Sequence, residues 1–107
     1  MKMFIIENTW LRLSAIPHGW GSGYVIIPKG HPAYGKDYAD IPVYVHGGLT
    51  FAEPANALNW KEIKKEDKEG WVVGFDTSHH NDNMLNWNKT AVEAETKSLK
   101  LQLEALS

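Results

Sequence analysis

Apolar residues along this chain fall into short runs that predict strands. Residues 3–6 and 10–16 are continuously apolar or alternate with polar positions, as strands do. Residues 23–28, GYVIIP, are rich in β-branched side chains and lie between a glycine and a proline, which predicts a third strand. Residues 71–76, WVVGFD, form an apolar run typical of a central strand.

The segments between these strands are more polar. Residues 29–42 contain prolines, glycines and scattered charges, which predict a long ordered loop. Residues 43–51, VYVHGGLTF, predict a strand, a glycine break and a further strand. Residues 61–70 are densely charged with both signs, which indicates a solvated connection or a short exposed helix.

The pattern near the C-terminal end is helical. Thr90 and Glu93 have the spacing of a capping box, which predicts the start of a helix. A stripe that recurs at helical spacing should face the sheet: Val92, Thr96, Leu99, Leu103 and Leu106. The predicted fold class is α+β, a mostly antiparallel sheet with one long C-terminal helix packed on it.

Composition narrows the class of protein. With 107 residues, we expect a single domain over residues 1–107. The net charge of −2 argues against general nucleic-acid binding, which needs a basic face. The absence of cysteine excludes disulfides and thiolate metal sites and fits a reducing compartment. The apolar run near the start is too short for a signal peptide or a membrane span, so we expect a cytoplasmic protein.

Two short segments hold three of the five histidines: VHGGLTF, residues 45–51, and GFDTSHHND, residues 74–82. In the second segment, Asp76, His79 and Asp82 follow at three-residue steps, so a turn would place them on one side. Imidazole and carboxylate groups suit a divalent metal such as zinc, manganese or iron, and they also suit general acid–base chemistry. They could equally bind a phosphate and hydroxyl groups, or Asp76 and Asn81 could cap a turn that the histidines decorate.

The first segment places two glycines directly after a histidine. Gly47 and Gly48 would expose backbone N–H groups to a phosphate or carboxylate, and Thr50 would add a hydroxyl. The alternative is a β-bulge beside a half-buried His46. If the two segments were adjacent strands, His46 would lie beside His79; whether they meet within one chain or across a dimer interface is left open by the sequence.

The loop GHPAYGKDY, residues 30–38, offers a third set of polar side chains. Lys36 is a candidate for phosphate binding, with His31 beside it, and Tyr34 could stack on a base or sugar. The alternative is a packed Ω-loop whose tyrosines fix it to the sheet.

The order of these motifs over residues 23–106 resembles a group of small phage and prophage proteins without an established activity. The pieces HGGLTF and GFDxxHxxD carry the resemblance, through His79 and Asp82. This chain has Thr77 where that group has a cysteine, so a cysteine nucleophile is not essential here. His80 stands where a small residue is usual. The resemblance implies a phage origin and the host cytoplasm.

Three functions remain open. The first hypothesis is non-catalytic capture of a phosphorylated or nucleotide-like small molecule, such as a host defence signal, with no cofactor. The pocket could lie within one chain or between the subunits of a homodimer. Its candidate ligand-binding residues are His31, Tyr34, Lys36, His46, Gly47, Gly48, Thr50, Asp76, His79 and Asp82. The second is a metal-dependent phosphoester hydrolase with ligands His46, Asp76, His79 and Asp82. The third is a protein-binding inhibitor of a host enzyme, anchored by exposed tryptophans.

Overall fold

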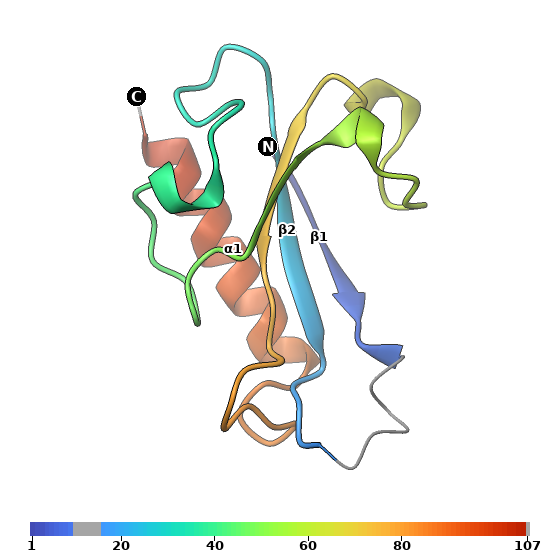
Figure 1. Ribbon diagram of the computed structural model, residues 1–107, viewed down its shortest axis with the longest axis vertical. Coiled ribbons are helices and arrows are strands. Elements are labelled where there is room, and N and C mark those ends of the chain that lie inside the picture. Colours follow the sequence, from blue (N-terminus) through green and yellow to red (C-terminus); the bar gives the residue numbers. More distant parts are fainter. Residues whose placement is uncertain (10–15, 107) are drawn as a thin grey trace.

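A four-stranded antiparallel sheet forms the centre of the fold in a computed structural model that describes residues 1–9 and 16–106. The spatial order is β1-β2-β4-β3, and every neighbouring pair is antiparallel. The helix α1 runs along one side of the sheet (Figure 1). The elements are β1 (Lys2–Glu7), β2 (Gly21–Ile27), β3 (Phe51–Pro54), β4 (Trp71–Phe75) and α1 (Lys89–Ala105).

This architecture confirms the predicted α+β class, with its antiparallel sheet and long C-terminal helix. The strands predicted at residues 3–6, 23–28 and 71–76 correspond to β1, β2 and β4, and β4 lies in the interior of the sheet as predicted. Most of the strand predicted at residues 10–16 lies outside the described residues. Its last residue, Ile16, is in an exposed bend.

Alternation along the central strands directs side chains into two cores, one on each face of the sheet. On the helix side, Val25 and Ile27 of β2 are buried together with the stripe of α1. On the opposite side, Ile26 packs with Val72 and with the segment that follows β3, through Ile63. Both central strands are therefore covered on both faces, which explains why their sequences are continuously apolar.

The predicted helical stripe is confirmed, because Val92, Thr96, Leu99 and Leu103 are fully buried. The predicted capping box at Thr90 and Glu93 is wrong. The N-cap is Asn88, whose side-chain oxygen accepts a hydrogen bond from the Ala91 N–H at 2.9 Å. Asn88 has an extended backbone and a short side chain that can accept from a free N–H of the first turn. The N-cap is therefore two residues earlier than the predicted Thr90.

The strand predicted immediately before Gly47 is also wrong, because residues 43–46 form no ladder and β3 begins only at Phe51. Side chains of α1 take the place of a neighbouring strand. Gln102 accepts from the Tyr44 N–H at 2.7 Å and donates to the Tyr44 carbonyl at 2.8 Å. Because these backbone groups are satisfied by the helix, the extended segment needs no partner strand.

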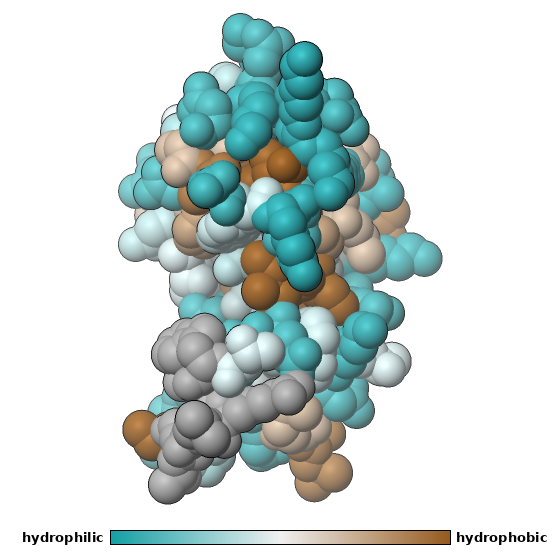
Figure 2. Space-filling view, turned by 90° about the vertical axis from the view of Figure 1, so that its right-hand side faces the viewer, coloured by the Kyte–Doolittle hydropathy of each residue, from teal (hydrophilic) through white to brown (hydrophobic). Residues whose placement is uncertain are grey.

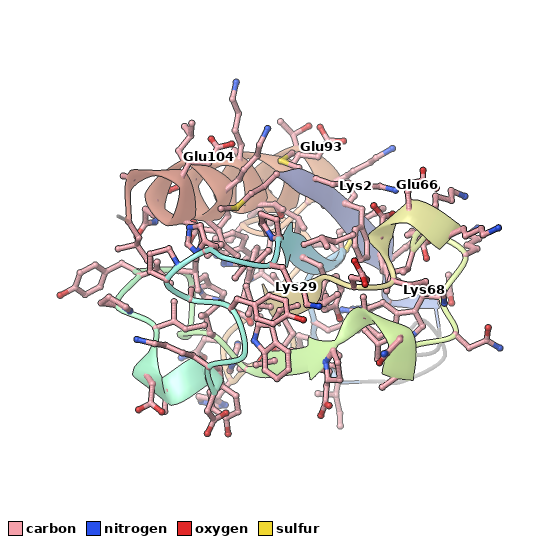
Figure 3. All side chains as sticks on the ribbon, turned by 90° about the horizontal axis from the view of Figure 1, so that it is seen from above. Lys2, Lys29, Glu66, Lys68, Glu93 and Glu104 are labelled. Carbon is pink, nitrogen blue, oxygen red and sulfur yellow. The ribbon has the colours of Figure 1, made fainter. Side chains whose placement is uncertain are left out.

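Three short 3-10 helices complete the described connections: η2 (Tyr38–Asp40), η3 (Ala55–Ala57) and η4 (Lys65–Asp67). For the charged residues 61–70, where a solvated connection or a short exposed helix was predicted, η4 corresponds to the short helix. It is tied to the first strand by an ion pair between Lys2 Nζ and Asp67 Oδ2 at 2.7 Å. Figure 3 shows Lys2 on the side of η4, whereas Glu93 and Glu104 lie on the outer side of α1. Among the described residues, no helix combines the length and the apolar character needed to cross a membrane.

Candidate functional site

The loop after β4 folds back on itself and brings its two acidic ends to one histidine. Asp76 follows the strand and accepts a hydrogen bond from the Ser78 N–H at 3.1 Å. Asn81 has a φ of 73°, a left-handed conformation, and the Asp82 N–H bonds to the His79 carbonyl at 3.0 Å. This turn places Asp82 Oδ2 2.8 Å from the His79 N–H and 3.2 Å from His79 Nδ1.

His46 reaches the same loop from a distant part of the sequence. Its N–H donates to Glu95 Oε2 of α1 at 2.8 Å, which fixes the backbone before the two glycines. Its ring lies against Trp87, with 4.1 Å between the ring centroids. Held from both sides, His46 Nε2 lies 2.6 Å from Asp82 Oδ1. His46 thus lies beside His79 within one chain, with 5.5 Å between their ring centroids, although it comes from a turn and not from a neighbouring strand.

Asp82 is the centre of this cluster. Its side chain is only 4% exposed, and its two oxygens contact different histidines, His46 through Oδ1 and His79 through Oδ2. A buried carboxylate is costly unless a positive or hydrogen-bonding partner compensates it. Here the His79 backbone N–H and the two imidazole rings lie within hydrogen-bonding distance of the carboxylate, and a cation bound between the three side chains would compensate it as well.

The cluster has the composition and spacing of a metal site. One potential ligand atom from each of His46, His79 and Asp82 can be chosen so that all three lie within 4.8 Å of one another. Ligands about 2.0–2.1 Å from a tetrahedral zinc ion lie roughly 3.4 Å apart. Binding would therefore widen the 2.6 Å contact between His46 Nε2 and Asp82 Oδ1 and draw the more distant ligand atoms together. The His46 and His79 side chains are 25% and 34% exposed, which leaves the cluster open to solvent on one side.

Gly47 has a role in this site that the sequence did not indicate. A Cβ added at Gly47 would lie 2.5 Å from the ring of His79, and the residue has a φ of +71°. The glycine therefore gives the His79 imidazole the space that it occupies. Gly48 has a similar φ of +78°, but an added Cβ there would meet nothing within 4 Å.

Asp76 and Thr50 flank the cluster without belonging to its three-residue centre. Asp76 Oδ1 lies 3.4 Å from His79 Nδ1, and Asp76 Oδ2 accepts from the Thr50 hydroxyl at 3.1 Å. The Asp76 side chain is 35% exposed. It is placed to accept a proton or to bind a ligand beside His79.

The other predicted binding residues lie at the opposite end of the molecule, where the C-terminal end of α1 meets the start of β4 (Figure 1). His31 Nε2 contacts the Leu103 carbonyl at 2.7 Å, and its Nδ1 accepts from the Ala33 N–H. The Tyr34 hydroxyl donates to the Glu69 carbonyl at 2.8 Å. These contacts match the packed-loop interpretation of residues 30–38.

Lys36 belongs to the same distant loop. Its backbone carbonyl accepts a hydrogen bond from Trp71 Nε1 at 2.9 Å, at the first residue of β4. Asp76 follows the last residue of that strand. The structure therefore does not bring His31, Tyr34 and Lys36 to the histidine cluster.

Sequence reasoning missed Trp87 and Glu95, which support His46. Glu95 sits among other charged helix residues, so nothing in the sequence distinguishes it. Thr77, at the cysteine position of the resembled group, is buried and donates to the Gly21 carbonyl at 2.6 Å. His80 is exposed and is not one of the three clustered residues.

A shallow cavity of about 400 Å³ adjoins the cluster and is lined by residues 78–83 together with Ile16 and Pro17. It includes His79 and Asp82, so a small molecule could lie against the open side of the cluster. The fold and site thus define an α+β protein with a two-histidine, one-carboxylate centre. Searches of protein-family models, curated proteins and solved structures found no match to this chain.

Proposed function

We propose that this protein binds one divalent metal ion, with zinc the best match, and uses it in a hydrolytic reaction. The observation that carries the proposal is the approach of potential ligand atoms of His46, His79 and Asp82 to within 4.8 Å. These residues come from two segments far apart in the chain. Their convergence around one buried carboxylate is specific to the folded state.

The donor set favours zinc in a catalytic site. Such sites use three protein ligands of the imidazole and carboxylate type and leave one position for water or substrate. Two histidines and one carboxylate also bind iron(II) in oxygenases. Metal analysis of the protein as purified from cells distinguishes these cases, and iron would contradict the hydrolytic part of the proposal.

Hydrolysis is supported by what surrounds the three residues. A zinc ion held by His46, His79 and Asp82 would supply a water of lowered pKa and would polarise a phosphoryl or carbonyl oxygen. Asp76, beside His79 and partly exposed, is positioned to accept a proton. The adjoining cavity, which is lined by His79 and Asp82 but not by Asp76, leaves room for a phosphoester.

Capture of a phosphorylated molecule without catalysis remains a prediction with a smaller set of residues. Lys36, the expected phosphate-binding cation, lies at the far end of β4. The candidate residues that remain close to one another are His46, Gly47, Gly48, Thr50, Asp76, His79 and Asp82. Inhibition of a host enzyme also remains a prediction. Its expected anchors are only half-buried where the structure describes them, at Trp20, Trp60, Trp71 and Trp87.

Competitive zinc titration tests the metal site. We expect one zinc ion per chain. Loss of a residue that only supports a metal ligand weakens metal binding by about 10–100-fold, and His46→Ala and Asp82→Asn should each weaken zinc binding by more than this. His80→Ala is the matched control, because His80 is adjacent in sequence but outside the cluster. Equal affinity in wild type and both cluster variants would exclude this site.

A second measurement separates hydrolysis from metal binding. Zinc-loaded protein should hydrolyse an activated phosphodiester, and Asp76→Asn should lower the rate by about 10²-fold or more, as expected for loss of a general base, while zinc affinity stays close to wild type. A protein that binds zinc tightly but leaves the ester intact would retain the metal site and reject the hydrolase.

A further inference from the structure

A second cavity lies on the face of the sheet opposite α1. Its volume is about 530 Å³, within the range of small-molecule sites. Tyr24 and Trp60 contribute aromatic surface, and Glu7, Glu62 and Asp76 contribute carboxylates. Figure 2 looks onto the β1 side of the molecule and shows apolar side chains exposed at the centre of this face, among hydrophilic ones.

The aromatic wall is fixed before any ligand arrives. Trp60 packs on Tyr24, Phe51 and Phe4, with ring centroids 5.0, 5.3 and 6.2 Å apart. Phe4 also stacks on Tyr24 at 5.3 Å. Burial raises the pKa of the Tyr24 hydroxyl; the Ser22 hydroxyl opposes this shift and the Asp76 charge adds to it. Tyr24 is therefore a neutral aromatic surface at physiological pH.

The charge of the cavity is negative. Glu7 ends β1, Glu62 follows η3, and Asp76 follows β4, so three separate segments bring carboxylates to one hollow. Among its described lining residues there is no lysine, arginine or histidine. A phosphate would be repelled here, whereas a cation would meet carboxylates and the negative faces of aromatic rings.

We propose that this cavity binds a small organic cation, an ammonium or guanidinium group joined to an apolar body. The apolar body lies against Trp60 and Tyr24, and the cationic group lies near Glu62 and Asp76. Aromatic faces and carboxylates together select a cation over a neutral molecule of the same shape. The cavity shares Asp76 with the proposed hydrolytic site, but binding of the cation does not depend on a bound metal.

Phenethylammonium, phenethyl alcohol and phenylacetate test the proposal, because they share one ring and differ in charge. Titration into the full-length chain, followed by calorimetry and by the tryptophan indole signals in NMR, gives the affinity for each. We expect the cation to bind, the neutral alcohol to bind more weakly, and the anion not to bind. The same order should hold with a chelator present, which keeps the result independent of any metal.

Glu62→Gln should weaken phenethylammonium binding by about three- to tenfold, the size of one partly exposed charge interaction, and leave the alcohol unaffected. Glu53→Gln, at an exposed position of β3 that does not line the cavity, is the matched control. Equal affinities for the cation and the alcohol, an unchanged affinity in Glu62→Gln, or no binding of the cation at millimolar concentration would each overturn the proposal.

Discussion

Asp82 is the residue on which the candidate site depends most. Its carboxylate is nearly fully buried and makes contacts with both His46 and His79. A neutral imidazole still carries one N–H, so both rings can donate to the carboxylate, and the His79 backbone N–H donates to Oδ2 as well. A divalent cation would instead take the two imidazole nitrogens and one carboxylate oxygen as ligands. The convergence of these three donor groups is the residue-level reason for the metal proposal.

The two adjacent glycines offer a matched test of the space around His79. Gly47→Ala and Gly48→Ala both place a side chain on a left-handed backbone, and each should lower the free energy of unfolding by about 1–2 kcal/mol. Only Gly47→Ala also displaces the His79 ring, so it alone should weaken zinc binding, by about tenfold or more. Thermal unfolding and zinc competition measure the two effects. Equal zinc affinity in both variants would contradict the packing role of Gly47.

The ion pair between Lys2 and Asp67 should make part of the stability pH-dependent. The hydrogen bond from Lys2 lowers the pKa of Asp67 below its ordinary value of 3.8, and the Lys64 backbone N–H adds to this shift. A lowered folded-state pKa means that the stabilisation is complete well above pH 3.8 and is lost as the pH falls through the folded-state pKa.

We expect Lys2→Met to lower the free energy of unfolding by less than about 1 kcal/mol at neutral pH, because the pair is partly exposed. That difference should disappear in acid, where Asp67 is protonated. Lys29→Met is the control, because Lys29 forms no ion pair within the described residues. Denaturant unfolding across this pH range measures both variants, and a Lys2→Met difference that persists in acid would contradict the assignment.

At the scale of elements, α1 does more than cover the sheet. Its Glu95 and Gln102 side chains bond to the backbone at His46 and Tyr44 and hold residues 43–46 extended without a partner strand. Alternation of apolar residues predicted a strand there, because a half-buried extended segment has the same pattern whether or not it is paired. The position of His46 therefore depends on contacts with a helix about fifty residues later in the chain, and local sequence carries no signal for them.

The start of α1 provides a test between two capping residues. Asn88→Ala should lower the free energy of unfolding by about 1 kcal/mol, since it removes the acceptor for the Ala91 N–H. Thr90→Ala, at an exposed position inside the first turn, should change it by less than about 0.5 kcal/mol. Denaturant unfolding of the two variants measures both changes in the free energy of unfolding. A larger loss from Thr90→Ala would restore the capping box that the sequence predicted.

Across the whole molecule, the fold class and the central strands could be predicted because apolar runs and a helical stripe are local signals. The proximity of Asp76, His79 and Asp82 could also be predicted, because a single turn of the chain brings residues at three-residue spacing to one side. The sequence could not predict that His31, Tyr34 and Lys36 lie away from the site. Their loop contacts the start of β4 and the C-terminal end of α1, and these contacts are non-local. The support of His46 by Trp87 and Glu95 is equally non-local.

Zinc-edge anomalous diffraction from crystals grown with zinc tests the central claim most directly. Our account predicts one strong peak per chain, about 2.0–2.1 Å from a nitrogen of His46, a nitrogen of His79 and an oxygen of Asp82, with one position left for water. A peak held by other residues would contradict the metal site. So would the absence of a peak while the hydrogen bonds from both histidines to Asp82 remain intact, which would leave the cluster as a structural polar network.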